Sequence, residues 1–295
     1  MGKLDNNARI IALLDCDNIG KSTIAKHVQK FKDPESAICD DAIKTLLSNK
    51  SQTSFKQYMA LVDDKTLLIE KSKQMGINLV TILNKDLFPE KLFNRSSPIV
   101  HLYYRGNISL LQSPIIAVIG SRKTPENVLS LSKRECERIA GHGLVIVSGL
   151  AIGVDTMAHI GCLDAKGKTI AVLPSDLRSI IPSQNKELAN RILESGGLLI
   201  SEYSIGVRFD INHYRERDRI QSALSEAILV PFCSDNSGTM IAVRDALRNH
   251  KPVFQFAGNN NPLIPLTYYP GTDESLFEIF SYTNNKNSSS QLELF

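Results

Sequence analysis

The pattern of hydrophobic and polar positions changes once along the chain. In the first part, apolar residues recur three and four positions apart, as at Ile24, Val28 and Phe31, which is the spacing of amphipathic helices. Two further amphipathic stretches follow at about 36–48 and 52–74. The first part of the chain therefore predicts a small all-helical domain.

From Gly76 onward, short apolar runs alternate with helical patterns. Runs in which nearly every residue is apolar are typical of strands buried on both faces, as in a parallel sheet. Their alternation with helices predicts an α/β fold, with a parallel, Rossmann-like sheet covered by helices. The predicted strands are 77–82, 98–106, 115–119, 144–148, 169–173, 198–201, 227–232 and 252–256.

Length and composition indicate a globular protein of about two domains, at roughly 150 residues each. The 295 residues are 42% hydrophobic and 22% charged, which is ordinary globular usage. We place the helical domain at 1–72, the α/β domain at 73–282 and a polar, flexible tail at 283–295. The net charge of +3 is too small to indicate nucleic acid by itself, so DNA binding would need basic residues gathered at one site.

Several classes of protein are disfavoured by what the sequence lacks. The five cysteines are widely spaced and form no C-x-x-C pair, so neither a disulfide framework nor a zinc site is expected. No stretch approaches the roughly 18 apolar residues of a membrane span. We therefore expect a cytoplasmic protein with reduced cysteines, without a metal or a membrane anchor.

The first candidate site is the segment Gly120-Ser121-Arg122, which follows a buried strand and precedes a helix starting near Pro125. A glycine turn before a helix presents backbone N–H groups and the positive end of the helix dipole, which suits a phosphate. Arg122 adds a bidentate fork for the same ligand. The alternative is an ordinary strand-to-helix turn with a solvated arginine.

A second loop of this kind runs from Ser148 to Asp155 and contains Gly149 and Gly153. Because parallel strands end at the same edge of a sheet, the two loops predict a shared crevice. The glycine spacing is not G-x-G-x-x-G, so no NAD site is implied. Asp155 and His159 are four residues apart on a helix, and we favour a structural hydrogen bond between them over an acid–base pair.

Two further segments add to the predicted crevice. Arg217 and Arg219 lie in a run where arginines alternate with acids, directly after Tyr214. An aromatic ring beside basic side chains is how single strands are held without reading their sequence, whereas the alternative is a solvated helix face with internal ion pairs. Ser237 and Gly238 follow another strand and offer hydroxyl and N–H donors.

The N-terminal segment 15–23 resembles a phosphate-binding Walker A loop, with Gly20-Lys21-Ser22 at its end. However, Asp15 stands where the first glycine belongs, and a carboxylate there would repel phosphates. The other interpretation is a helix–hairpin–helix, in which Asn18 adopts the left-handed backbone conformation that asparagine tolerates. We favour the hairpin over an ATP site.

Taken together, the segments resemble the DNA-processing protein A family, DprA or Smf. The resemblance implies an extended Rossmann-like core of the SLOG type, preceded by a small helical domain of the helix–hairpin–helix or SAM-like type. The matching pieces, in order, are Gly120-Ser121-Arg122, Ser148-Gly149-Leu150-Ala151 with Gly153 and Asp155, Ala158-His159, Ile181-Pro182 with Asn185, Ser201-Glu202-Tyr203, Arg217, Arg219-Ile220, Leu224-Ser225 and Ser237-Gly238.

By resemblance, the protein binds and protects single-stranded DNA and loads the RecA recombinase during natural transformation. It would act as a homodimer, without a cofactor and without catalysis. Arg122 would be a main phosphate contact, Arg217 and Arg219 match the family's R-x-R segment, and Lys186 would be a second basic contact. The alternative is a nucleotide-binding sensor or nucleotide-cleaving enzyme that uses the same crevice.

The sequence also departs from the family at several positions. Ile152 stands where the family commonly has arginine, Asp218 replaces the usual asparagine between the two arginines, and Ala223 replaces a usual glycine. The first two departures remove a positive charge and add a negative one, so we expect weaker DNA binding.

The polar tail ends in an apolar segment, Gln291-Leu292-Glu293-Leu294-Phe295. It resembles the peptide by which bacterial proteins dock on the replication sliding clamp. Gln291, Leu292, Leu294 and Phe295 would make the contacts, with Leu294 and Phe295 filling an apolar pocket, and the Ser/Asn-rich linker would supply reach. The alternative is a tail that folds back onto the protein's own core.

Overall fold

The computed structural model describes residues 6–234 and 237–284, which form two compact units. The first unit contains the chain up to Arg105 together with Glu202–Val207. The second unit contains Gly106–Ser201 and the chain from Arg208 onward. Residues 73–105, which the sequence groups with the α/β domain, are thus part of the compact unit that holds the N-terminal helices.

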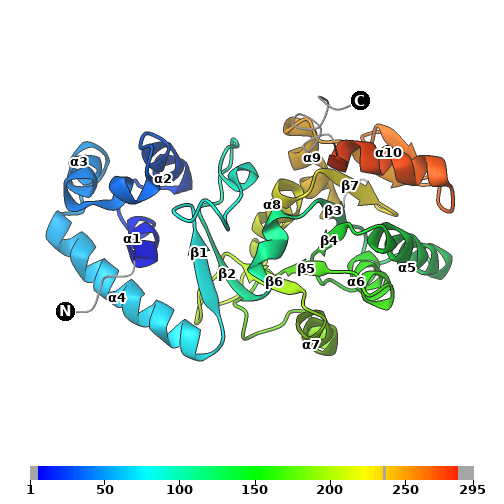
Figure 1. Cartoon of the computed structure of the whole chain (residues 1–295), viewed down its shortest axis with the longest axis horizontal. Helices are drawn as coiled ribbons and strands as arrows, with labels where there is room; N and C mark the ends of the chain where they lie inside the picture. The colour runs from blue at the N-terminus through cyan, green and yellow to red at the C-terminus, as the bar shows by residue number, and fades with distance from the viewer. Residues whose placement is uncertain (1–5, 235–236, 285–295) are drawn as a thin grey trace, which may run out of the picture. The chain divides into compact units, whose positions relative to one another are not determined.

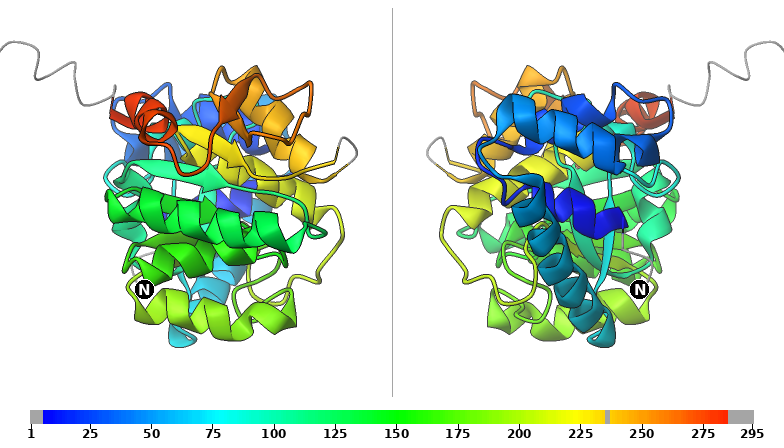
Figure 2. Two further views of the ribbon diagram at one scale, coloured as in Figure 1. Left: turned by 90° about the vertical axis from the view of Figure 1, so that its right-hand side faces the viewer. Right: turned by 90° about the vertical axis from the view of Figure 1, so that its left-hand side faces the viewer.

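The first unit is built from helices and one antiparallel strand pair, β1 with β2 (Figure 1). Helix α1 packs against α4, and the core between them contains Ile10, Leu13 and Tyr58 (Figure 2, right). The elements are α1 (Asn6–Leu13), α2 (Lys21–Val28), η1 (Pro34–Ile38), α3 (Asp40–Lys50), α4 (Phe55–Gln74), β1 (Asn78–Thr81), η2 (Glu90–Leu92) and β2 (His101–Gly106).

The turn between α1 and α2 has the geometry of the expected hairpin. Asn18 adopts a left-handed conformation with φ of 59°, which asparagine accepts more readily than most residues. A phosphate-binding loop of the Walker type follows a strand, whereas the segment before this turn is helix α1. The ammonium group of Lys21 forms an ion pair of 2.9 Å with Glu202, so this lysine already has an anionic partner.

The second unit is a doubly wound α/β layer structure. Its strands are parallel and lie in the order β6-β5-β4-β3-β7-β8-β9. The strands are β3 (Ile115–Val118), β4 (Val145–Ser148), β5 (Thr169–Val172), β6 (Leu198–Ser201), β7 (Ala227–Val230), β8 (Val253–Phe256) and β9 (Leu266–Tyr268). The helices are η3 (Ile108–Gln112), α5 (Glu126–Gly141), α6 (Val154–Asp164), η4 (Ser183–Asn185), α7 (Lys186–Glu194), α8 (His213–Leu224), α9 (Thr239–Arg248) and α10 (Asp273–Asn284).

Strands β3 to β8 are buried on both faces, as their continuous apolar sequences predict. Helices α5, α6 and α7 lie on one face of this sheet, and α8 and α9 lie on the other (Figure 1). Figure 2, left, shows α5 and α6 side by side across their face. The predicted Rossmann-like α/β fold class is therefore confirmed.

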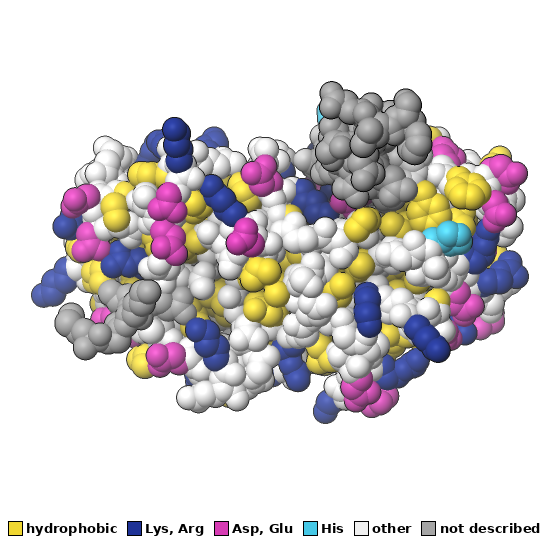
Figure 3. All heavy atoms as spheres, viewed as in Figure 1, with side chains coloured by type: hydrophobic (Ala, Val, Ile, Leu, Met, Phe, Trp, Pro, Cys, Tyr) yellow, Lys and Arg dark blue, Asp and Glu magenta, His cyan; other side chains and the backbone are white. Residues whose placement is uncertain are grey.

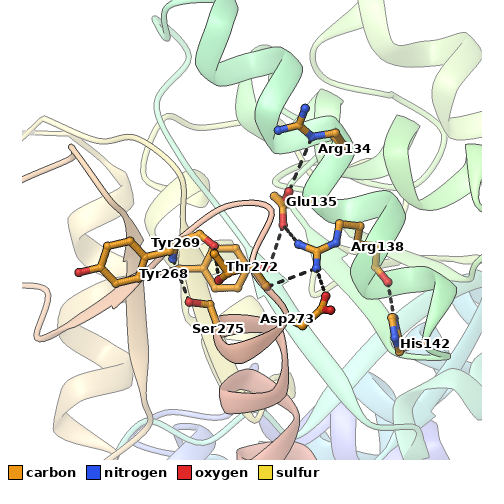
Figure 4. A network of polar contacts seen from close by, with 9 residues as sticks. All are labelled: Arg134, Glu135, Arg138, His142, Tyr268, Tyr269, Thr272, Asp273 and Ser275. Carbon is orange, nitrogen blue, oxygen red and sulfur yellow. Dashed lines mark hydrogen bonds and ion pairs between the residues drawn. The ribbon is translucent and has the colours of Figure 1, made fainter.

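The short strand β9 was not predicted from the sequence. It is attached through Tyr268, whose hydroxyl donates to the buried carboxylate of Glu135 on α5 at 2.9 Å (Figure 4). Arg138 donates to the same carboxylate at 2.8 Å and to Asp273 of α10 at 2.6 Å. Burial raises the pKa of Tyr268 above its usual value, so this phenol stays a donor. The network joins α5, β9 and α10 through contacts that local patterning cannot reveal.

Within the described ranges, no helix combines the length and the apolar character needed to cross a membrane.

Candidate nucleic-acid interface

A pocket of ≈ 580 Å³ opens where β3 and β7 end. The chain leaves β3 toward β4, β5 and β6 on one side and continues through β7 and β8 on the other, so the two neighbours mark the topological switch point of the sheet. Doubly wound sheets bind their ligands at this position. The switch-point pocket is lined by Ile119, Gly120, Ser121, Arg122, Lys123, Ala151, Asp155, Tyr214, Arg217, Asp218, Phe232, Ser234, Ser237, Gly238, Thr239 and Ala242.

The loop after β3 forms one wall of this pocket. Its backbone is tied down because Ser121 N–H donates to Phe232 O at 2.9 Å and Thr124 Oγ1 donates to Ser121 O at 2.9 Å. Pro125 then precedes the first turn of α5, and no side chain within the described part of the protein caps that turn. Arg122 and Lys123 are both exposed at this helix start. The wall therefore combines two exposed cationic side chains with the positive end of a helix dipole.

The loop after β4 forms a second part of the pocket lining. The side chain of Asp155 is buried and accepts hydrogen bonds from the N–H groups of Gly149 at 3.1 Å and Ala151 at 3.4 Å. Ser148 Oγ donates to Val118 O at 2.6 Å and is buried as well. Gly153 has φ of 92°, and a Cβ there would lie 2.6 Å from Ser121 O. Within the loop after β4, Ala151 and Asp155 line the pocket, whereas Ser148, Gly149 and Gly153 are not among its lining residues and hold the loop in place.

Arg217 reaches the pocket from α8 but is almost fully enclosed. Its side chain is 6% exposed, and Nη1 lies 2.9 Å from Asp218 Oδ1 and 3.7 Å from Asp155 Oδ2. The guanidinium rests directly on Gly149, where an added Cβ would lie 1.6 Å from Nη1. Arg217 is thus the centre of a buried ionic cluster with two carboxylates, rather than a solvated cation.

Tyr214 supports the exposed arginine of the opposite wall. Cζ of Arg122 lies 4.5 Å from the centroid of the Tyr214 ring, and Cζ of Arg217 lies 5.8 Å from it. A guanidinium over an aromatic face is attracted by the ring quadrupole. The sequence suggested Tyr214 as a platform for a base, whereas in this structure the ring holds Arg122 in place.

The two carboxyl groups in the pocket, Asp155 and Asp218, are weaker acids than usual, because the pKa of each is raised. Burial raises the pKa of Asp218 to about 6, and the nearby Asp155 adds to this, while Arg217, Arg122 and a hydrogen bond from Gln221 act in the opposite direction. Burial also raises the pKa of Asp155, against the opposing effect of Arg217 and the backbone donors. For both carboxyl groups, burial in low-dielectric surroundings therefore affects the pKa more than the adjacent cations do.

His159 has a structural role, but the expected partner was wrong. Its Nδ1 lies 2.7 Å from Thr169 Oγ1, and that hydroxyl donates to Ile146 O at 2.7 Å, so the imidazole Nδ1–H is the donor. Asp155 bonds instead to backbone N–H groups of its own loop. Burial lowers the pKa of His159 to about 3, so the ring is neutral at physiological pH. The side chain therefore joins α6 to β5.

Two basic residues predicted for DNA contact do not line the pocket. Arg219 is half-buried on α8, and Lys186 is exposed at the first position of α7. Lys186 is nevertheless held near the loop after β4, because the neighbouring Asn185 donates from Nδ2 to Leu150 O at 2.8 Å and to Thr156 Oγ1 at 2.9 Å. The lining of the pocket is therefore formed without these two cations.

Two charged residues that line the pocket, Lys123 and Asp218, were not among the predicted site residues. Lys123 lines the pocket next to Arg122, and its position on the same glycine loop was the available signal. Asp218 was noticed only as a departure from a family pattern. The pair Asp235 and Asn236 and the tail segment Gln291–Phe295 lie outside the described residues. Over the part of the chain that is described, no cluster of His, Cys, Asp and Glu is suited to a metal ion.

On the face seen in Figure 3, basic and acidic side chains are interspersed rather than gathered by sign. The part of this face that is drawn in colour therefore has no single broad basic field.

A doubly wound parallel sheet with an arginine-bearing pocket at its switch point defines a Rossmann-like α/β protein. The family model described as DNA recombination-mediator protein A matches residues 79–264, so the chain belongs to this family.

Curated relatives are about one third identical to this chain over the aligned region. It is 33% identical to the protein Smf of Borreliella burgdorferi over 189 residues, which is 64% of this chain and 60% of the relative. It is 33% identical to the DNA processing protein DprA of Streptococcus pneumoniae over 198 residues, or 67% of this chain and 68% of the relative. The match to Smf of Synechocystis covers 47% of that protein, so the chain spans about half to two thirds of such relatives.

Two solved structures show the same fold. The X-ray structure of DprA from Streptococcus pneumoniae superposes with a TM-score of 0.69 at 24% identity, covering 99% of this chain and 100% of the other. DprA from Helicobacter pylori gives a TM-score of 0.57 at 28% identity, with 72% and 96% coverage. The latter structure concerns the single-stranded DNA binding mode of the Helicobacter protein.

Proposed function

We propose that this protein binds single-stranded DNA in the switch-point pocket without cleaving it. The observation that carries the proposal is the placement of Arg122. It is exposed at the start of α5, lines the pocket and is supported by the ring of Tyr214. The family membership and the DNA-binding Helicobacter relative support the same ligand.

The chemistry of the pocket suits a phosphodiester. A phosphate at the start of α5 would meet the guanidinium of Arg122, the ammonium of Lys123 and backbone N–H groups together. Ser237 lines the opposite wall, and its buried hydroxyl, which has no hydrogen-bond partner among the described residues, would supply a further donor. A flexible single strand can bend a phosphate into such a pocket, whereas a duplex holds its phosphates at fixed spacing. Lys186 and Arg219 would contact neighbouring phosphates outside it.

A binding role fits the acids better than a catalytic one. Asp155 is engaged by backbone donors and by Arg217, which leaves it poorly placed to activate water. Glu202, the other acid considered for turnover, does not line the pocket and pairs with Lys21. DNA would therefore be held and released unchanged.

The cellular role that we propose is taken from the family. We place the protein in the cytoplasm, as a homodimer that protects single strands and passes them to the RecA recombinase during transformation or recombination. Both protection and transfer require that the protein first binds DNA, so DNA binding is tested first.

A nucleotide ligand is the second candidate. It is favoured by the ≈ 580 Å³ volume of the pocket and by its location at the switch point, where doubly wound folds bind nucleotides. In that case a mononucleotide would bind tightly to the isolated protein, and Asp155 would be required for turnover.

Fluorescence anisotropy with a labelled oligothymidine tests the proposal, against a matched duplex and against ATP, at two salt concentrations. We expect preference for the single strand, a steep loss of affinity with salt, and a drop of about tenfold or more in Arg122→Ala. Arg248→Ala is the matched control, because Arg248 is an exposed arginine in the last turn of α9 and does not line the pocket. Equal binding by both variants, or a preference for ATP, would overturn the proposal.

A further inference from the structure

The switch-point pocket contains a carboxylate where an anion would bind. Asp218 lines the pocket, its side chain is 14% exposed, and its Oδ1 lies 2.9 Å from Nη1 of Arg217. Asp218 and the more distant Asp155 both approach this same atom, Nη1, and Gly149 lies against the guanidinium. An anion that pairs with Nη1 from the pocket therefore competes with Asp218 while that carboxyl group is ionised.

Groups from three elements determine the charge that Asp218 experiences. Arg217 and Gln221 face it from its own helix, and Gln221 Nε2 donates to Oδ1 at 3.2 Å. Asp155 approaches from α6, and Arg122 approaches from the loop after β3. A phosphate held by Arg122 would add a negative charge to this cluster and would compete with Asp218 for Arg217.

We propose that Asp218 sets the affinity of the pocket for phosphate, because a bound phosphodiester replaces the Asp218 carboxylate opposite Arg217 and leaves that carboxyl group protonated. The proton comes from solvent, and no covalent bond of the ligand forms or breaks. This inference rests on the proposed function, since it concerns how the same pocket accepts its DNA phosphate.

The consequence is that binding is linked to proton uptake. Burial already raises the pKa of Asp218 to about 6, and the ligand's charge raises it further. Above that value, each molecule of DNA bound takes up as much as one proton. Affinity therefore falls as pH rises, by up to about tenfold per pH unit between about pH 6 and pH 8. A phosphodiester stays ionised over this range, so the ligand itself does not contribute to the slope.

The test measures oligothymidine affinity across this pH range at constant ionic strength, for wild type and Asp218→Asn. The wild type is expected to lose affinity steeply with pH. The Asn variant, which mimics the protonated carboxyl, is expected to bind about tenfold more tightly near pH 7.5 and to lose the slope. Glu216→Gln is the matched control, because it removes the same charge from an exposed position on the same helix and should keep the slope.

Calorimetry of the wild type provides an independent measurement that needs no substitution. The binding enthalpy is measured in two buffers with different ionisation enthalpies, and the difference gives the number of protons taken up per DNA bound. Near pH 7 we expect uptake of up to one proton for the wild type and none for Asp218→Asn. A wild-type affinity that is flat with pH, or a slope retained in Asp218→Asn, overturns the inference while Arg122-dependent binding still supports the proposed function. Absence of oligothymidine binding at every pH would instead overturn the proposed function itself.

Discussion

The guanidinium of Arg122 lies over the aromatic ring of Tyr214, with Cζ 4.5 Å from the ring centroid. Arg122 belongs to the loop after β3, and Tyr214 belongs to the first turn of α8 on the other face of the sheet. The contact holds the most exposed arginine of the pocket in a defined position before any ligand arrives. Preorganisation of this kind reduces the side-chain entropy lost on binding.

Replacement of Tyr214 should weaken DNA binding through Arg122. We expect Tyr214→Phe to bind as wild type, because the ring face is kept, and Tyr214→Leu to lose about three- to tenfold in affinity, from a contact worth roughly 1 kcal/mol. A double-mutant cycle with Arg122→Ala checks the mechanism. If Tyr214→Leu weakens binding equally in the Arg122→Ala background, the ring acts by some other route.

Gly149→Ala should destabilise the protein strongly. An added Cβ would lie 1.6 Å from Nη1 of Arg217, and displacing that guanidinium would leave Asp155 and Asp218 as buried carboxylates without their shared partner. The expected loss is about 3 kcal/mol in the free energy of unfolding, measured by chemical denaturation. Gly141→Ala in α5 is the control, because a Cβ there meets nothing within 4 Å, and it should be neutral or slightly stabilising.

Asp218 should also make stability depend on pH. Its pKa is raised to about 6 in the folded protein, so ionisation favours the unfolded chain. The stabilisation is complete below the unfolded pKa of about 4 and is lost as pH rises through about 6, by a total of roughly 3 kcal/mol. Melting temperatures of wild type and Asp218→Asn should therefore diverge between pH 4 and pH 7, with the variant gaining. A constant difference would contradict the shifted pKa.

The terminal segment offers a prediction from sequence alone, since Gln291–Phe295 lie outside the described residues. A peptide containing these residues should bind a bacterial sliding clamp, and Leu294→Ala or Phe295→Ala should weaken binding about tenfold or more through loss of apolar burial. Glu293→Ala is the control, because a charged side chain between two anchors contributes little. If neither Leu294→Ala nor Phe295→Ala changes the binding of the peptide to the clamp, the predicted clamp interaction is wrong.

Much of the second unit was predictable because its signals are local. Continuous apolar runs marked β3 to β8, and Gly120, two residues after the end of β3, marked the loop that carries Arg122. Asn18 likewise indicated its left-handed turn, because few other residues adopt that conformation at low cost. Strand β9 was not predicted because it has only three residues, of which only the last is buried, and because Tyr268 is held by Glu135, which lies 133 positions earlier.

The sequence by itself determined the fold class, the family and the edge of the sheet where a ligand would bind, since these depend on hydrophobic periodicity and on the motifs at strand ends. Only the tertiary structure decided what each charged side chain does there. The sequence predicts Arg217 as a phosphate contact, whereas the structure encloses it between Asp155, Asp218 and the backbone of Gly149, so that a phosphate competes with Asp218 for it. Charge, burial and acidity depend on neighbours that are distant in sequence, and folding alone brings those neighbours together.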